Sequence, residues 1–175
     1  FHYNKLSIEI FHKKNLSNLI IDLQKVITPL SKKAIKQYFS YLIILLKPIK
    51  QEKILDFGSG NGAFAFYLKQ SFNTKIFSIE VSKPLIDFQK KKLGLKNVYK
   101  LNKNNFKLNF PNNYFHKSVS NNVITYFKNK KFLENQLNEM IRVTELKIVL
   151  TGILNKKYKK KLEKEQMKNE NISVI

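Results

Sequence analysis

Three glycines alternate at Gly58, Gly60 and Gly62, directly after a short apolar stretch that contains Asp56. Glycine is needed where the backbone turns tightly or where a ligand must lie against it. An amphipathic stretch, residues 63–72, follows at once, so the pattern predicts a strand, a glycine turn and the start of a helix. Backbone N–H groups at a helix N-terminus are free to meet a ligand. The run therefore predicts a nucleotide-type binding pocket.

Two classes of ligand use such a turn. Gly58, Gly60 and Ala63 fit the G-x-G-x-x-G/A fingerprint of dinucleotide binding, and another nucleotide-binding Rossmann relative remains the alternative. Asp56 disfavours a dinucleotide, because its pyrophosphate would lie beside a carboxylate. S-adenosylmethionine instead brings an ammonium and a sulfonium group, which a carboxylate attracts. The run from Ile54 to Gly62 resembles motif I of the class I S-adenosylmethionine-dependent methyltransferases.

Glu80 ends the next apolar stretch, a little over ~20 residues past the glycine turn, where a ribose-binding acid is expected. A carboxylate at this place accepts hydrogen bonds from both ribose hydroxyls. The family that the glycine run resembles also has an acid here. The resemblance therefore implies that Glu80 binds the ribose of S-adenosylmethionine, with Val81 beside it.

The segment 108–116 looks like the "LPFPDNSFD" stretch of the same family. Counting back from it, the resemblance places the family's adenine-contacting aspartate on Asn104, next to Asn105. Asparagine keeps a carbonyl acceptor but loses the charge, which weakens such a contact by about 1 kcal/mol. The family's acid at the start of the next strand is His116 here. His116 is not expected to be a base, because a strand of four or five residues separates it by ~15 Å from the ligand.

Asn121 and Asn122 follow that strand, beside the place expected for the methyl donor. Tyr126 is a candidate for the wall of the substrate pocket, although aromatics at this spacing are more often core residues. The sequence Asn-Asn-Val-Ile at 121–124 differs from the N-P-P-Y signature of methyltransferases that act on amino groups of adenine or glutamine, which disfavours a nucleobase target. No catalytic base stands out, so the catalytic residues stay unassigned.

The predicted site has two parts. The resemblance and the spacing together assign cofactor binding to Asp56, Gly58, Ser59, Gly60, Gly62, Glu80, Val81, Asn104, Asn105 and Asn121. The substrate pocket is assigned more weakly, to Asn122 and Tyr126. No cluster of metal-ligand type is visible, and the chain has no cysteine, which excludes disulfides and cysteine-bound zinc.

Strands and helices alternate from residue 52 onward. The expected strands are Lys53–Phe57, Lys75–Glu80, Val98–Leu101, Lys117–Ser120 and Lys147–Thr151. The expected helices are Gly62–Phe72, Lys83–Leu93, Lys131–Val143 and Lys156–Lys168. Such alternation favours right-handed crossovers and a mostly parallel, doubly wound Rossmann-like α/β sheet. Ligands of these sheets bind at the carboxyl ends of the strands, near the topological switch point.

The first fifty residues precede this pattern and look helical. Apolar residues recur at helical spacing over 16–27, and a second helix is predicted over 31–46, ending before Pro48. We therefore expect an N-terminal helical cap or lid over 1–50 and a methyltransferase core over 51–175, in one domain overall. These helices are expected to pack on the sheet or to cover the ligand. Methyltransferase sheets continue through further strands, so we expect the chain to be a fragment that lacks the C-terminal strands.

The formal net charge of +21 invites a nucleic-acid partner. However, 33 residues are basic and Arg142 is the only arginine among them, whereas nucleic-acid sites favour the bidentate fork of arginine. A composition set by an AT-rich genome explains this profile better. The longest apolar run is far below the ~20 residues of a membrane span, and no signal peptide is visible. A cytoplasmic protein is expected, and its oligomeric state stays open.

The resemblance covers residues 50–165 and is closest to small-molecule methyltransferases of the type 11 group, some of which serve cell-surface polysaccharide biosynthesis. It implies methyl transfer from S-adenosylmethionine to a small molecule, for instance a sugar or polysaccharide precursor. Two alternatives stay open. One is an RNA or protein methyltransferase, supported by the charge alone. The other is a non-catalytic methyltransferase-like subunit of a ribonucleoprotein, because Asn104, His116 and the missing Pro-Gly-Gly turn before the fifth strand depart from the family pattern.

Overall fold

The computed structural model describes residues 32–102, 107–123 and 129–152. These residues form four helices and five strands. In chain order they are α3 (Lys32–Leu46), β1 (Lys53–Phe57), α4 (Ala63–Phe72), β2 (Lys75–Glu80), α5 (Lys83–Leu93), β3 (Val98–Lys100), β4 (Phe115–Asn121), α6 (Lys130–Val143) and β5 (Thr144–Thr151). The helices predicted over 16–27 and 156–168 lie outside the described residues.

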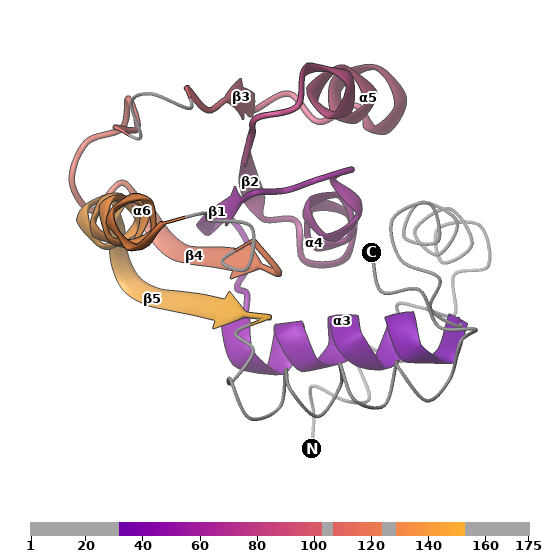
Figure 1. Cartoon of the computed structure of the whole chain (residues 1–175). Helices are drawn as coiled ribbons and strands as arrows, with labels where there is room; N and C mark the ends of the chain where they lie inside the picture. Colours follow the sequence, from indigo (N-terminus) through magenta and orange to yellow (C-terminus); the bar gives the residue numbers. More distant parts are fainter. Residues whose placement is uncertain (1–31, 103–106, 124–128, 153–175) are drawn as a thin grey trace, which may run out of the picture.

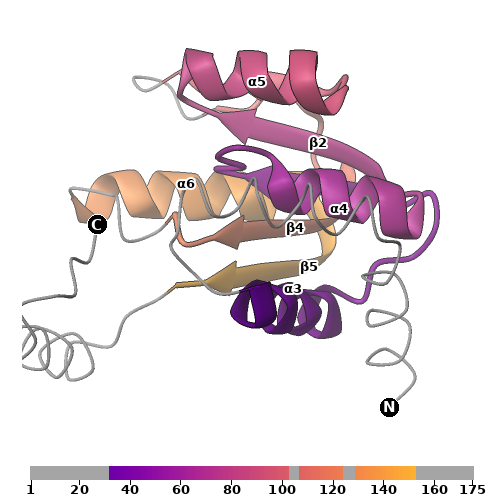
Figure 2. The same cartoon turned by 90° about the vertical axis from the view of Figure 1, so that its right-hand side faces the viewer.

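The strands form one sheet in the order β3-β2-β1-β4-β5, and every neighbouring pair is parallel. Figure 2 shows β2, β4 and β5 running in the same direction, with their arrowheads at one edge. The chain runs outward from β1 to β3 and then returns to place β4 on the other side of β1. The topological switch point therefore lies between β1 and β4. This is the doubly wound, Rossmann-like α/β fold predicted from the sequence.

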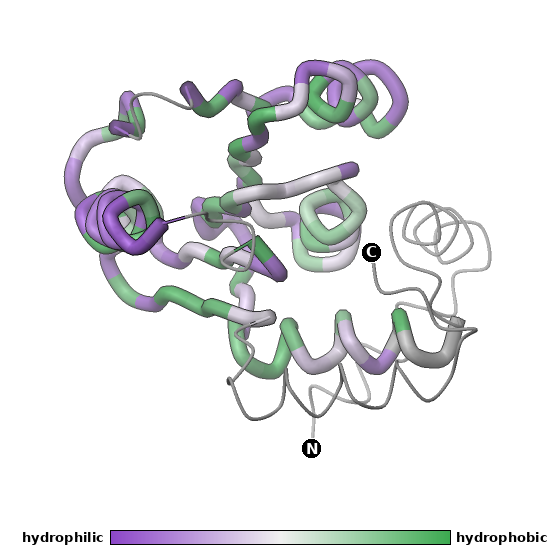
Figure 3. Tube along the Cα trace, in the orientation of Figure 1, coloured by the Kyte–Doolittle hydropathy of each residue, from purple (hydrophilic) through white to green (hydrophobic). Residues whose placement is uncertain are grey.

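Helices cover both faces of the sheet. Figure 1 shows α3, α4 and α5 on one face and α6 on the other. Because α4 lies between α3 and α5, six consecutive residues of α4, Ala63 to Leu68, are buried. Figure 3 shows the same difference in hydropathy, with α4 largely pale to green and α6 carrying more hydrophilic residues.

Helix α3 packs against the sheet. Phe39, Leu42, Ile43 and Leu46 recur at helical spacing and are at most 1% exposed, and they join the core formed with α4 and the strands. The Phe39 ring contacts Phe64 edge-on, with ring centroids 5.3 Å apart. Full burial of each such side chain contributes about 1.5–3 kcal/mol. Helix α3 therefore packs on the sheet, which is one of the two arrangements expected for the N-terminal helices.

A buried ion pair joins the end of α3 to the sheet. Lys117 of β4 places its Nζ 2.8 Å from Glu52 Oε1 and 2.9 Å from Glu52 Oε2. The same ammonium donates to the carbonyl of Lys47, just past α3, at 2.6 Å. Glu52 Oε2 also accepts from the Ile49 N–H at 2.7 Å. Because the carboxylate and the ammonium satisfy each other and nearby backbone groups, both charges can stay buried.

Between β3 and β4 the described residues, 101–102 and 107–114, form no helix, and aromatic rings cover this part of the sheet. Phe77 of β2 packs edge-on against Phe110 and Phe115, with centroids 6.0 and 5.2 Å apart. Phe110 in turn stacks on Tyr114 at 5.4 Å. Among the described residues, these rings supply the apolar cover on this part of the sheet.

Arg142 holds this segment in place. Its guanidinium forms a two-pronged pair with Glu139, at 2.7 and 2.8 Å. It also donates to the carbonyls of Phe110 at 2.8 Å and Leu108 at 2.9 Å. Five donors in a planar fork can serve all these acceptors at once, whereas an ammonium cannot. The only arginine of the chain thus has a structural role.

We therefore expect Arg142→Lys to lower the free energy of unfolding by about 1–3 kcal/mol, because at least one carbonyl and one carboxylate oxygen lose their donor. Chemical denaturation at pH 7 measures the change. Glu134→Gln is the control on the same helix, since the Lys130–Glu134 pair is 89% and 54% exposed and such pairs contribute little. Equal stability of Arg142→Lys and the parent would contradict the role assigned to the guanidinium.

Candidate functional site

The glycine turn connects β1 to α4 at the topological switch point. Gly58, Gly60 and Gly62 have φ angles of +75°, +57° and +78°, in the left-handed region that other residues rarely adopt. A Cβ on Gly58 would also lie 2.2 Å from Cγ2 of Val123, which follows β4. The sequence therefore places glycine where both the backbone angle and the space require it.

The N–H groups of the turn are occupied by groups of the protein itself. Gly58 and Ser59 donate to the carbonyl of Ile79, at 2.8 and 3.1 Å. Gly62 donates to the carbonyl of Ser59 at 2.9 Å, and Ala63 donates to Asn61 Oδ1 at 3.1 Å. The expectation of free donors is therefore wrong for these four residues, which include the first residue of α4. A pyrophosphate, which binds through such donors, finds none at these four residues.

Glu80 ends β2 and turns its carboxylate back over the glycine turn. Its Oε2 accepts from the Gly60 N–H at 2.8 Å. Its Oε1 accepts from the N–H groups of Val81 at 2.8 Å and Ser82 at 2.9 Å. The side chain is therefore fixed by three backbone donors. Within the described part of the chain, Oε2 accepts one of the two hydrogen bonds that a carboxylate oxygen can take. Ribose binding by Glu80 remains a prediction.

Asp56 lies in the centre of the sheet, one residue before the end of β1, and is 2% exposed. Its Oδ2 has no hydrogen-bond partner among the described residues. Burial, and to a smaller extent the nearby charge of Glu80, raises the pKa of this carboxyl to about 7. An acid that is buried without a partner is an unsatisfied group, and a cation close to it would favour its charged form.

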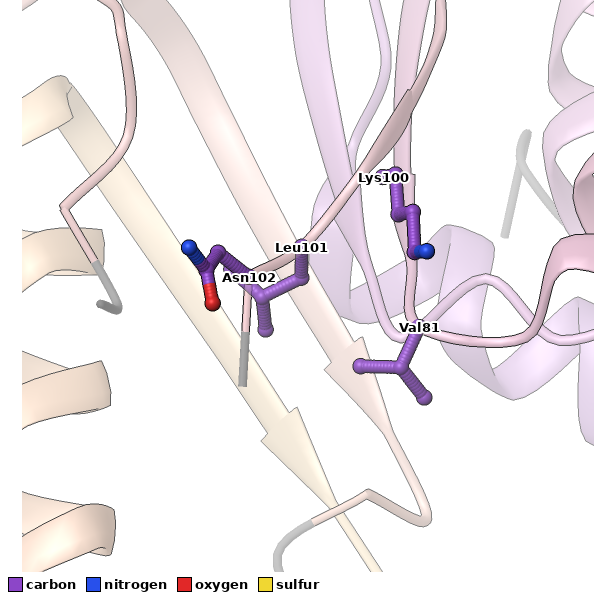
Figure 4. Close-up of a pocket in the computed structure, with 4 residues that line it drawn as sticks. All are labelled: Val81, Lys100, Leu101 and Asn102. Carbon is purple, nitrogen blue, oxygen red and sulfur yellow. The ribbon is translucent and has the colours of Figure 1, made fainter. Parts of the chain in front are cut away.

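A hollow lies beside the carboxyl ends of β2 and β3. Its volume is about 540 Å³, and Val81, Lys100, Leu101 and Asn102 line it. Figure 4 shows that these side chains come from two neighbouring segments, one after β2 and one at the end of β3. Val81 and Leu101 offer apolar walls, and Asn102 offers an amide, which suits a flat ligand with polar edges. The hollow borders Glu80 through Val81, its neighbour in the chain.

The side chain of Asn121, at the end of β4, contacts other parts of the fold. Its Oδ1 accepts from the hydroxyl of Tyr38 in α3 and from Thr151 Oγ1 at 2.7 Å. Asn122 Nδ2 donates to the same Tyr38 hydroxyl at 3.3 Å. Burial raises the pKa of the Tyr38 phenol, so it stays protonated and is a donor rather than a base. This polar cluster joins α3 to the ends of β4 and β5, beside the place expected for the methyl donor.

The remaining predicted residues fall into two groups. Ser59, Val81 and Asn122 lie in the described part, around the turn, the hollow and the polar cluster. Asn104, Asn105 and Tyr126 lie outside the described residues. His116, which was not expected to be a base, accepts from the Lys53 N–H through Nδ1 at 3.1 Å and so has a structural role.

Gln89 is a site residue that sequence reasoning missed. It lies on α5, is 0% exposed, and donates through Nε2 to Ser59 Oγ and to the Gly60 carbonyl, both at 2.8 Å. The sequence does contain a signal for Gln89, namely its position in the predicted helix. Ile86, Gln89 and Leu93 form the buried stripe of α5 at helical spacing, and a glutamine in such a stripe needs a buried partner.

Two further observations concern the described residues alone. No group of three His, Cys, Asp or Glu side chains there lies close enough together to hold a metal ion. None of the helices described is both long and apolar enough to span a bilayer.

Comparisons with known proteins identify the family. The family model of the methyltransferase domain matches residues 54–146, which is more than half of the chain. No curated protein matches the sequence. The fold resembles a TehB-like SAM-dependent methyltransferase from Corynebacterium glutamicum, at 19% identity over 67% of this chain and 66% of that one, with a TM-score of 0.54.

Two other solved structures are similar. One is the geranyl diphosphate C-methyltransferase of Streptomyces coelicolor, at 17% identity over 73% of this chain and 53% of that one, with a TM-score of 0.54. The other is a SAM-dependent methyltransferase from Thermotoga maritima, at 22% identity over 74% and 57%, with a TM-score of 0.53. The chain spans less than two thirds of the length of each of these three proteins. With the family model, the fold and the turn in agreement, the chain belongs to the methyltransferase domain family, the class I fold whose cofactor is S-adenosylmethionine.

Proposed function

We propose that the chain transfers a methyl group from S-adenosylmethionine to a small-molecule acceptor, such as a sugar or polysaccharide precursor. The observation that carries the proposal is the charge of the turn. Asp56 in β1 and Glu80 at the end of β2 lie beside it. The N–H groups of its three glycines, of Ser59 and of Ala63 are bonded to protein acceptors. This arrangement repels an anionic ligand and attracts a cationic one.

The described residues fit S-adenosylmethionine. The unpaired, buried Oδ2 of Asp56 and the remaining acceptor capacity of Glu80 Oε2 suit a cation and a ribose hydroxyl. The hollow beyond Val81 suits an adenine ring. When bound, the cofactor supplies an activated methyl group on a cationic sulfur. The protein then has mainly to hold donor and acceptor in line and to exclude water.

The acceptor side is expected at the ends of β4 and β5. Tyr38, Asn121 and Thr151 hold one another there through hydrogen bonds, so they form a rigid polar wall rather than a base. A wall of this kind orients hydroxyl or amine groups of an acceptor by hydrogen bonding. One structural neighbour is a geranyl diphosphate C-methyltransferase, which agrees with an acceptor of small size.

An RNA acceptor is the second candidate, and one observation favours it. Exposed lysines gather on α5 and the segment that follows it, and Lys100 also lines the hollow: Lys83, Lys90, Lys91, Lys92, Lys96 and Lys100. Asp87 is the only acid among residues 83–102. A transfer assay with tritiated S-adenosylmethionine distinguishes the candidates. Label in the small-molecule fraction of a cell extract supports the first, and label in RNA supports the second.

Glu80→Ala should weaken the binding of S-adenosylhomocysteine by a factor of about 10–100, because each charge-assisted hydrogen bond contributes about 1.5–3 kcal/mol. Isothermal titration calorimetry on the full chain measures the affinity. Glu134→Ala is the matched control, since Glu134 is an exposed acid of α6 on the other face of the sheet. Unchanged affinity in Glu80→Ala would show that Glu80 does not contribute to cofactor binding.

A further inference from the structure

A side chain of α5 forms hydrogen bonds with the glycine turn. Gln89 is fully buried, and its Nε2 donates to Ser59 Oγ and to the Gly60 carbonyl at 2.8 Å each. We propose that Gln89 is a positioning residue that fixes the turn in the conformation required for cofactor binding. The proposal rests on the proposed function, because it assigns the contact to binding rather than to folding.

The Gly60 backbone is held from two sides. Glu80 of β2 accepts its N–H, and Gln89 of α5 donates to its carbonyl. The φ of Gly60 is +57°, so the chain has no steric preference that would set this angle without such contacts. The Gln89 side chain also lies against Gly62, where a Cβ would be 2.6 Å from Gln89 Cγ. Gln89 therefore fixes both the orientation of one peptide and the packing at the start of α4.

Glutamine is not the residue that gives the folded protein the greatest stability at this position. Its Oε1 is buried without a hydrogen-bond partner among the described residues. A buried unsatisfied acceptor is destabilising, and replacing an amide by an apolar group of similar shape is often neutral or stabilising. Ser59 and Gly60 are partly exposed, so water can replace the lost donor. What the glutamine contributes, and an apolar residue would not, is the geometry of the turn.

Gln136 of α6 provides a matched control. It is also 0% exposed, and its Oε1 is likewise without a partner in the described part of the chain. Among the described residues, its Nε2 donates to the weak acceptor Met140 Sδ alone, at 3.9 Å. Gln136 lies on the other face of the sheet, away from the glycine turn. Substituting either glutamine removes the same buried amide, but only Gln89 contacts the turn.

The experiment compares Gln89→Met and Gln136→Met with the parent in the full chain. Calorimetric titration with S-adenosylhomocysteine should show at least tenfold weaker binding for Gln89→Met and unchanged binding for Gln136→Met. Both variants should keep or exceed the melting temperature of the parent. Without ligand, the Gly60 amide should exchange its hydrogen faster in Gln89→Met alone, as followed by NMR.

Two results would overturn the inference. If the parent binds and Gln89→Met binds within twofold of it, Gln89 does not position the turn, while the proposed function stands. The same conclusion follows if Gln89→Met melts well below the parent and exchanges faster throughout the sheet, because its role is then structural. If the parent itself binds no S-adenosylhomocysteine, the proposed function fails together with this inference.

Discussion

Asp56→Asn should raise the free energy of unfolding at pH 8 by about 1–3 kcal/mol, an unusual gain for removing a charged residue. The reason is the raised pKa of the buried carboxyl, about 7 in the folded protein against an ordinary 3.8. Ionising Asp56 in the folded state is therefore costly. Asparagine has nearly the same shape and removes this cost, although its amide has to fit at the same buried position.

The pH dependence has a definite sign. Between about pH 4 and pH 7 the unfolded chain has released the Asp56 proton, but the folded chain still holds it. The contribution of Asp56 to stability therefore falls as the pH rises through this window and is constant above it. Denaturant titrations at pH 5 and pH 8 should show a smaller loss of stability over this range in Asp56→Asn than in the parent.

Asp87→Asn is the matched control, because Asp87 is an exposed acid whose pKa is lowered, chiefly by its hydrogen bond to Lys83. Its pH profile from pH 5 to pH 8 should run parallel to that of the parent. Asp56→Asn should also bind S-adenosylmethionine more weakly than the parent at pH 8, since the cation loses a carboxylate. Parallel profiles for Asp56→Asn and the parent would contradict a buried acid beside the turn whose Oδ2 has no hydrogen-bond partner among the described residues.

Lys117→Met should lower the free energy of unfolding by about 3–5 kcal/mol, because it leaves the buried carboxylate of Glu52 without its cation. The side chains of Lys117 and Glu52 are 8% and 10% exposed, so water reaches neither charge readily. The Lys47 carbonyl at the end of α3 loses its donor as well. Urea denaturation at pH 7 measures the loss.

The double variant Glu52→Gln/Lys117→Met separates the pair from the rest of the fold. Removing both charges should recover part of the lost stability, since the main cost of the single variant is the charge left behind. Lys147→Met serves as control, because Lys147 is exposed and lies in the neighbouring strand β5. A double variant that is less stable than Lys117→Met would contradict a mutually satisfied pair.

The elements nearest the site were predicted well because local residues set their ends. Strands β1 and β2 and helix α5 have the predicted bounds, and Gly58, Pro84 and Gly94 stand next to three of these six ends. Strand β3 ends one residue earlier than predicted, at Lys100, whereas β4 and β5 are longer than predicted. β4 starts at Phe115 and β5 at Thr144, because His116 and Glu145 interrupted the apolar pattern. The structure tolerates His116 in β4 through its bond to the Lys53 N–H.

The residues of the site that belong to the sequence motif, the glycines and the two acids, were predicted. The glycines and the two acids were recognised because their spacing is local, but the groups that hold them come from distant parts of the chain. Gln89 reaches the turn across about 30 residues, and Lys117 meets Glu52 across 65. In a chain with so many lysines, nothing in the sequence distinguishes Lys117 from its exposed counterparts. Such partners are set by tertiary packing, which periodicity does not reveal.

The central claim is that a turn lined by carboxylates binds a cationic methyl donor and rejects an anionic dinucleotide. Isothermal titration calorimetry of the full chain at pH 8 tests it directly, with S-adenosylmethionine and NAD⁺ as separate titrants. We predict one molecule of S-adenosylmethionine bound per chain and no heat of binding with NAD⁺. Binding of NAD⁺, or no binding of S-adenosylmethionine by the folded chain, would contradict the claim.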